Sequence, residues 1–154
     1  MLSYRKLVEA DLKELSELVW TVFSEFVAPY YSQEGIINYK KFIDPEHLKD
    51  NFNSGNMEFY GCFEEEKIVG VIAVRQINHI CLFFIDKNYH GQGIAKKLFA
   101  LVKNNIVNNN NTKKYITVNS SPYAVKIYER LGFNAIDEEQ VKDGIRFTPM
   151  KYIF

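Results

Sequence analysis

The sequence predicts a mixed α/β domain in which helices pack on a mostly antiparallel sheet, and three observations support this prediction. Apolar residues recur at helical spacing within the first 26 residues. Three apolar runs separated by tight polar turns follow within residues 57–86, and a loop with two glycines then leads into another helical pattern. No internal repeat or linker divides the chain, so we expect residues 1–154 to form a single domain.

The first third of the chain is expected to form one strand and two helical stretches. The strand covers residues 2–7. Asp11 stands three residues before a glutamate, which is the spacing of a capping box at a helix start. The apolar positions of the helix that follows are Leu12, Leu15, Val19, Val22, Phe23 and Phe26. Pro29 ends this helix, and a second helical stretch covers residues 33–52 with a break expected before Pro45.

The middle of the chain is expected to form three strands joined by tight turns. The strands cover residues 57–64, 67–77 and 79–86, and Asn78 lies in the second turn. Because the turns are short, consecutive strands should pair as an antiparallel meander. A helix over residues 91–107 follows the glycine loop. Its apolar face consists of Ile94, Leu98, Leu101, Val102 and Ile106.

The last third is expected to add a strand, a helix and a hairpin. Residues 108–114 form a polar loop, residues 115–119 a strand, and residues 121–133 a helix. The expected end signals of this helix are Ser121 as N-cap, Pro122 as first helical residue and Gly132 as the stop. Residues 133–140 and 145–153 form a final hairpin around an Asp-Gly turn. The predicted element order is βααβββαβαββ.

Composition excludes several function classes. Lys plus Arg and Asp plus Glu both number 19, so the basic excess of a general nucleic-acid binder is missing. The most apolar stretches, residues 68–74 and 80–85, are far shorter than a membrane span. The first residues lack the apolar region of a signal peptide. Cys62 and Cys81 follow no metal-binding spacing and read as reduced thiols. We therefore expect a cytoplasmic protein without metal, nucleic-acid or membrane partner.

The glycine loop has the features of an anion site. Gly91 and Gly93 precede a helix whose first N–H groups and positive dipole end are unpaired. Lys96 and Lys97 would be slightly unfavourable near that helix end, by about 0.3–1 kcal/mol each, unless an anion binds there. A tight turn with two solvated lysines is the alternative. The loop matches neither the triphosphate-binding nor the dinucleotide-binding glycine pattern.

Two motifs resemble those of the GCN5-related N-acetyltransferase family. The family pattern Gln/Arg-x-x-Gly-x-Gly/Ala reads His90-Gly91-Gln92-Gly93-Ile94-Ala95 here, and Ile85 stands at the family's apolar strand position five residues earlier. Residues 120–133 are similar to the family's last core helix, Asn-x-x-Ala-x-x-hydrophobic-Tyr-Glu-x-Leu-Gly-Phe. His90 replaces the usual Gln or Arg, Lys87 replaces a frequent Pro, and Ser121 replaces a frequent Asn. The site should tolerate these departures, because backbone N–H groups make most of the family's pyrophosphate contacts.

The resemblance implies a fold and a cofactor. The fold has helices on both faces of a twisted sheet whose fourth and fifth strands splay apart. The cofactor is acetyl-coenzyme A, with its pyrophosphate on the N–H groups of residues 91–96 and its pantetheine arm paired with the backbone of residues 83–85. The expected contact residues are Phe83, Phe84, Ile85, His90, Gly91, Gln92, Gly93, Ile94, Ala95, Lys96, Asn119 and Tyr123.

The resemblance also implies catalytic roles. Tyr128 matches the family tyrosine that protonates the leaving sulfur. The attacking amine must be neutral, whereas an alkyl amine with a pKa near about 10.4 is mostly protonated at pH 7, so a base is expected. Counting six residues back from Ile85 gives His79 as a candidate base, while Glu64 and a water chain are the alternatives.

The acceptor is expected to be a primary amine of a small molecule or a peptide. The variable region before residue 56 is aromatic and could line an apolar or cation–π pocket with Tyr30, Tyr31, Tyr39 and Phe42. Core packing is the alternative role for these residues, and it is the expected one for Phe42. His47, in the same region, could also touch the substrate. A catalytically silent acyl-coenzyme A sensor or interaction module is an alternative function, and an unrelated nucleotide-binding domain is another. Both a monomer and a homodimer fit the sequence.

Overall fold

The computed structural model describes residues 1–109 and 112–154, so positions 110 and 111 of the expected loop 108–114 lie outside the described residues. The strands of the described part are β1 (Leu2–Lys6), β2 (Met57–Glu64), β3 (Lys67–Arg75), β4 (His79–Ile85), β5 (Tyr115–Ser120), β6 (Asn134–Ala135), β7 (Gln140–Lys142) and β8 (Ile145–Ile153). The α-helices are α1 (Leu12–Phe26), α2 (Gln33–Phe42), α3 (Pro45–Ser54), α4 (Ile94–Asn108) and α5 (Val125–Leu131). Short 3₁₀ turns cover Glu9–Asp11, Ala28–Tyr30 and Lys87–Tyr89.

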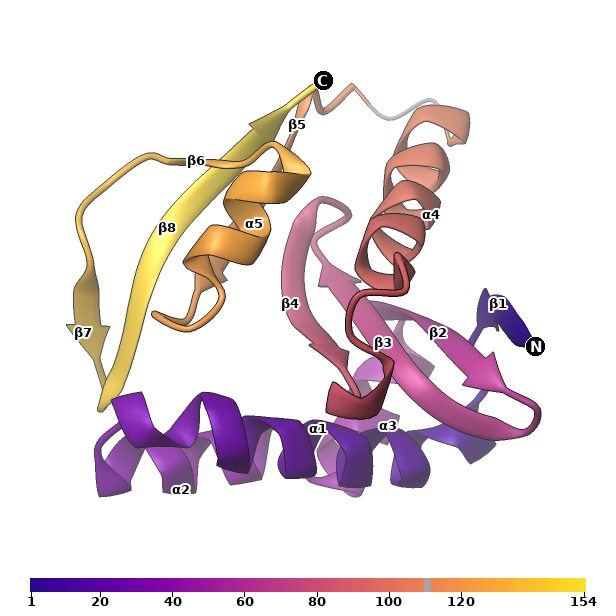
Figure 1. The fold of residues 1–154 in the computed structure, drawn as a ribbon, viewed down its shortest axis with the longest axis horizontal. Coiled ribbons are helices and arrows are strands. Elements are labelled where there is room, and N and C mark those ends of the chain that lie inside the picture. Colours follow the sequence, from indigo (N-terminus) through magenta and orange to yellow (C-terminus); the bar gives the residue numbers. More distant parts are fainter. Residues whose placement is uncertain (110–111) are drawn as a thin grey trace.

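One sheet carries the helices on both faces, which confirms the predicted mixed α/β fold. In the described part the strand order is β1-β2-β3-β4-β5-β8-β6, and β7 pairs with β8. Helices α1 and α3 pack on one face through a core that includes Leu15, Leu48 and Phe59. Helices α4 and α5 cover the other face, with Leu98 and Phe133 in its core (Figure 1). Among the described residues, no helix is long and apolar enough to cross a membrane.

Strands β2, β3 and β4 form the predicted antiparallel meander. Strand β3 ends at Arg75, two residues earlier than expected. The reason is the turn that follows, because Gln76 and Ile77 both take positive φ angles of 53° and 76°, which no strand residue adopts. The chain therefore reverses before Asn78, and His79 opens the next strand.

Strands β4 and β5 diverge soon after they meet, as the family resemblance implied. Their parallel pairing is confined to His79 with Thr117 and Ile80 with Val118. On its other side β4 contains a bulge, since Ile80 and Leu82 pair with consecutive residues of β3 and leave Cys81 between them. Beyond Ile80 the edge of β4 on the β5 side pairs with no strand, and the two ribbons diverge there (Figure 1).

Two helices begin differently from what their local sequence predicts. The expected capping box at the start of α1 is wrong, because Asp11 accepts a hydrogen bond from the Val8 N–H at 2.7 Å and pairs with Arg5, while Glu14 accepts from the Ile68 N–H at 2.8 Å. Helix α4 begins at Ile94 instead of residue 91, because the two loop glycines before it have positive φ angles.

The last helix and the hairpin also differ in detail from the expectation. Helix α5 begins at Val125, and Ser121 closes the preceding turn by accepting the Ala124 N–H on its hydroxyl at 3.3 Å. Gly132 ends this helix at a φ of 106°, as expected. The predicted first hairpin strand over residues 133–140 is reduced to the short strands β6 and β7.

The β7–β8 hairpin holds the segment that leads into α2. The Ser32 N–H donates to the Gly144 carbonyl at 3.1 Å, and the Asn38 side chain donates to the Asp143 carbonyl at 3.3 Å. A Cβ atom placed on Gly35 would overlap the Gly144 carbonyl oxygen, so the two backbones touch directly. This contact joins residues more than 100 positions apart.

Candidate active site

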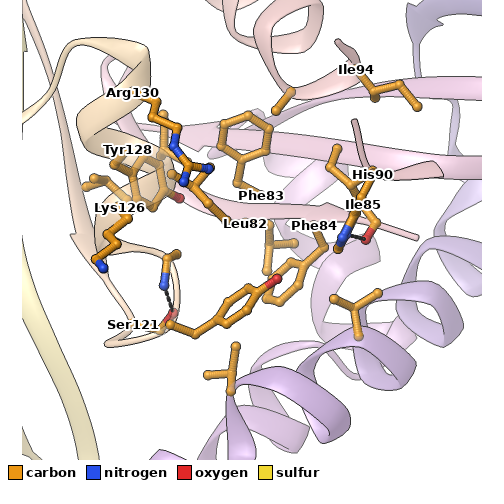
Figure 2. A pocket seen from close by; sticks show the side chains of 18 of the residues that line it. Leu82, Phe83, Phe84, Ile85, His90, Ile94, Ser121, Lys126, Tyr128 and Arg130 are labelled. Carbon is orange, nitrogen blue, oxygen red and sulfur yellow. Dashed lines mark hydrogen bonds between the residues drawn. The ribbon is translucent and has the colours of Figure 1, made fainter. Parts of the chain in front are cut away.

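The opening between β4 and β5 is a cavity of about 550 Å³. Its walls come from four parts of the chain, namely the free part of β4, the loop between β4 and α4, the β5–α5 segment, and the region from α1 to α2. Figure 2 shows Phe83 and Phe84 on opposite sides of β4, with His90 at one end of the cavity and Tyr128 across from it. The cavity thus connects the two faces of the sheet.

The loop before α4 presents unpaired backbone donors. The first helical hydrogen bond runs from the Lys97 N–H to the Gly93 carbonyl at 3.1 Å, and the N–H groups of residues 91–96 donate to no described residue. Gly91 and Gly93 have φ angles of 79° and 78°, and a Cβ atom on either would meet nothing within 4 Å. The loop is therefore an open row of donors at a helix N-terminus, which suits a phosphate group.

Most of the residues expected to contact a cofactor line this cavity. They are Phe83, Phe84, Ile85, His90, Gly91, Gly93, Ile94, Ala95, Asn119 and Tyr123. The side chains of Gln92 and Lys96 do not line it, although their N–H groups belong to the unpaired row. Lys97, the second lysine of the loop, lies over the Tyr4 ring at 5.5 Å and points elsewhere.

His90 ties the loop to the end of β4. Because a carbonyl oxygen can only accept, the His90 Nε2–H donates to the Ile85 carbonyl, at 3.0 Å (Figure 2). The imidazole ring also lies 6.0 Å from the ring of Phe26, at the end of α1. The histidine that departs from the family motif thus fixes the position of the glycine loop.

Tyr128 presents a free hydroxyl to the cavity. Its side chain is only 6 % exposed, and its ring packs edge-on against Phe83 at 5.9 Å and Phe133 at 5.3 Å. Among the described residues, none forms a hydrogen bond with the hydroxyl. Burial, and to a smaller extent the nearby Cys81, raises the Tyr128 pKa, so the hydroxyl stays protonated at neutral pH and can donate.

Three further weak acids line the same cavity. Burial raises the pKa of Tyr31 to about 12 and the pKa of the bulge residue Cys81 to about 12, and it raises the Tyr39 pKa well above its ordinary value. All three are therefore protonated at neutral pH. The Cys81 thiol points its proton to the Ala73 carbonyl at 3.6 Å. The cavity is consequently rich in proton donors.

The candidate bases lie outside the cavity lining. His79 stands where β4 and β5 are still paired, and its Nδ1 is 2.8 Å from the Thr117 Oγ1. Burial and the neighbouring Arg75 lower the His79 pKa to about 4. Glu64 lies at the end of β2, 3.5 Å from the terminal amine of Met1. His47 belongs to a separate surface hollow and donates its Nδ1–H to the Phe42 carbonyl at 2.8 Å.

The lowered pKa of His79 predicts a pH-dependent stability. Between about pH 6.5 and about 4 the unfolded chain binds a proton at this residue and the folded chain does not, so the free energy of unfolding should fall as the pH falls through this range. We expect a loss of about 2 kcal/mol, reduced from the full shift because solvent reaches part of the ring. Urea unfolding at a series of pH values should show this loss, and His79→Gln should remove it.

Asp11 provides an internal control for that experiment. Its hydrogen-bonded pair with Arg5 lowers the Asp11 pKa below the ordinary 3.8, so its contribution to stability is lost only at lower pH. A pH profile that is the same in the native chain and in His79→Gln between pH 6.5 and 4 would contradict the assignment.

Two cations in the cavity wall lie outside the family motifs and were not predicted. Lys126 and Arg130 line the cavity from α5, on the Tyr128 side (Figure 2). Their spacing of four residues, flanking Tyr128, could have indicated a shared helix face. None of the described lining residues is Asp or Glu, so the charged side chains of the wall are cationic. The described residues also contain no group of three His, Cys, Asp or Glu side chains that could hold a metal ion.

Comparison with known proteins places this architecture in a family. The model of the acetyltransferase (GNAT) domain matches residues 27–154. No curated protein sequence matches the chain. Among solved structures, the PaiA N-acetyltransferase from Thermoplasma acidophilum in complex with coenzyme A has a TM-score of 0.80 at 19 % identity, covering 100 % of this chain and 99 % of its own.

Two further structures share the fold. The GCN5-related N-acetyltransferase from Rhodopseudomonas palustris has a TM-score of 0.82 at 16 % identity and covers 99 % of this chain and 95 % of its own. A predicted acetyltransferase with acetyl-CoA from Clostridium acetobutylicum has a TM-score of 0.73 at 17 % identity, with 92 % and 95 % covered. The family model matches most of the chain, and strands β4 and β5 separate beside the glycine loop. This chain therefore belongs to the GNAT acetyltransferase family.

Proposed function

We propose that this protein transfers an acetyl group from acetyl-coenzyme A to a primary amine of a small molecule or peptide. The observation that carries the proposal is that one cavity contains both an open row of backbone donors and the hydroxyl of a largely buried tyrosine, Tyr128, that has no hydrogen-bond partner among the described residues. The first feature suits the diphosphate of the cofactor, and the second suits the departing sulfur. The likeness to structures that contain coenzyme A or acetyl-coenzyme A supports the same cofactor here.

The described residues offer partners for the diphosphate and for the pantetheine arm of this cofactor. The N–H groups of residues 91–96 would hold the diphosphate, and the unpaired edge of β4 around residues 83–85 offers backbone groups to the amides of the pantetheine arm. Asn119 and Tyr123 line the cavity from the β5–α5 segment, and Tyr123 stacks on Phe26 at 4.9 Å. When bound, the cofactor supplies an activated acetyl thioester.

Residues of the cavity would then orient the thioester and protonate the departing sulfur. The exposed backbone N–H groups of β4 can stabilise the developing oxyanion, and Tyr128 can donate a proton to the sulfur. His79 would reach the acceptor only through water, because it does not line the cavity. A histidine of pKa about 4 is also a weak base for an alkylammonium of pKa about 10.4.

A binding and transfer experiment tests the proposal. Coenzyme A at about a hundredfold excess over its dissociation constant should raise the melting temperature by roughly 5–10 °C, whereas equal concentrations of ATP and NAD should raise it far less. Acetyl-coenzyme A should then release thiol in the presence of a suitable amine. Equal stabilisation by ATP or NAD would favour an unrelated nucleotide-binding domain.

A further inference from the structure

The acceptor side of the cavity has an aromatic and apolar surface. We call Val22, Val27, Tyr31, Tyr39 and Phe84 the aromatic wall. Tyr39 stacks on Phe23 at 4.2 Å with an interplanar angle of 6°, and Tyr31 meets the same Phe23 edge-on at 5.4 Å. These ring contacts fix the wall in place, and the β7–β8 hairpin holds the segment that carries it. The wall therefore forms a rigid apolar surface on the α1–α2 side of the cavity.

The wall offers no partner for a positive charge. The described lining contains no carboxylate, and its own charged side chains are Lys126 and Arg130. Glu25 interacts with the lining residue Tyr123, but it does not line the cavity itself, and Lys87 pairs with it at 2.9 Å. One face of the Tyr39 ring is covered by Phe23, which limits cation–π binding. A protonated amine would lose its hydration here without compensation.

The cavity is also poor in groups that could remove a proton. Tyr31, Tyr39, Cys81 and Tyr128 are all protonated at neutral pH. His90 is the lining residue that keeps an acceptor nitrogen, Nδ1, because its Nε2–H donates to the Ile85 carbonyl, and its ring lies at the glycine-loop end of the cavity. An acceptor that arrives already neutral needs no base for its attack on the acetyl group.

The proton balance of the reaction agrees with this environment. The lone pair of a neutral amine attacks the thioester carbonyl carbon, an N–C bond forms, and the C–S bond breaks. The nitrogen loses one proton and the sulfur gains one, so the products are an amide and a thiol without net proton uptake. Tyr128 can pass its proton to the sulfur and regain one from the nitrogen through solvent.

We infer that the acceptor is a weakly basic primary amine on an aromatic or branched apolar body, such as the α-amino group of a hydrophobic α-amino amide. This inference rests on the proposed acetyl transfer. A peptide-type α-amino group has a pKa of about 7.7–8.0, so roughly one molecule in ten is neutral at pH 7, against roughly one in 2,500 for a lysine-type amine of pKa about 10.4. Such an acceptor matches both the apolar wall and the scarcity of proton acceptors among the described lining side chains.

Matched acceptors test the inference directly. Phenylalaninamide and phenethylamine share one aromatic body and differ in the carboxamide that lowers the amine pKa. We expect kcat/KM at pH 7 to be at least about tenfold higher for phenylalaninamide, and higher than for spermidine or Nα-acetyl-lysinamide. The rate with phenethylamine should rise about tenfold per pH unit from about pH 6.5 to about 8.5, while the rate with phenylalaninamide levels off near pH 8.

A pair of variants tests the role of the wall. Tyr31→Glu places a carboxylate there, so it should shift the ratio of kcat/KM toward phenethylamine by about tenfold, whereas Tyr31→Gln should leave the ratio unchanged. Equal ratios in both variants would show that the acceptor does not use this wall and would overturn the inference.

The outcomes separate the acceptor class from the reaction itself. A higher kcat/KM with spermidine or Nα-acetyl-lysinamide, or a flat pH profile with phenethylamine, would overturn the acceptor class and leave the transferase activity intact. Binding of coenzyme A without transfer to any amine of the panel would overturn the transferase proposal and the inference together.

Discussion

Replacing Tyr128 with Phe is expected to lower kcat for acetyl transfer by about 10²–10³-fold while coenzyme A binds with unchanged affinity. The substitution removes only the hydroxyl, and the ring keeps its packing against Phe83 and Phe133. Because the hydroxyl has no hydrogen-bond partner among the described residues, its removal should barely change the melting temperature. Steady-state thiol release and calorimetric titration with coenzyme A measure the two quantities.

Tyr4→Phe is the matched control for this variant. The Tyr4 hydroxyl is buried outside the cavity beside the Cys62 thiol, and it has no partner at hydrogen-bond distance in the described part of the chain. We expect kcat in Tyr4→Phe to stay within about twofold of the native value. If Tyr128→Phe left turnover with every acceptor unchanged, Tyr128 would have no role as a proton donor. Coenzyme A binding without any turnover in the native chain would instead favour the silent sensor.

Gly93→Val should weaken coenzyme A binding by about 10–100-fold. Gly93 is the residue before the first turn of α4 and has a φ angle of 78°, where a β-branched side chain is strained by roughly 1–2 kcal/mol. The open space beside its Cα lies in the row of N–H groups that we assign to the diphosphate, so the new side chain would also obstruct the ligand. Calorimetric titration with coenzyme A measures the loss of affinity.

Gly55→Val separates backbone strain from ligand contact. Gly55 has the same φ angle of 78°, and a Cβ atom there also meets nothing within 4 Å, but it ends α3 away from the cavity. Both variants should lose similar stability in urea unfolding, and only Gly93→Val should lose coenzyme A affinity. Equal affinity in the two variants would mean that the loop does not hold the cofactor.

Much of the fold and of the cofactor side was predictable because the signals are local. The strands of the meander, the glycine loop and the helix that carries Tyr128 each have their pattern within one short stretch. The divergence of β4 and β5 followed from the family resemblance, and the structure confirms it. The assignment of Tyr128 and the loop to catalysis and binding stays a prediction.

The remaining features depend on contacts between distant residues. Asp11 has the spacing of a helix cap, but Arg5 and the Val8 N–H compete successfully for its carboxylate. The bulge at Cys81 follows from its pairing with β3 and has no signature in the sequence of β4 alone. The sequence offers Tyr30, Tyr31 and Tyr39 as candidate residues of a substrate pocket. Only tertiary packing puts Tyr31 and Tyr39 into the cavity and keeps Tyr30 out of its lining.

The touching backbones of Gly35 and Gly144 limit how this protein can be recombined with its relatives. A chimera that takes its first 55 residues from another member would bring a foreign side chain or a different loop length to that junction, where no Cβ atom fits. We expect such hybrids to fold well only when the C-terminal hairpin is inherited from the same parent. An exchange of segments that is meant to change the specificity would therefore have to transfer the first 55 residues and the C-terminal hairpin together.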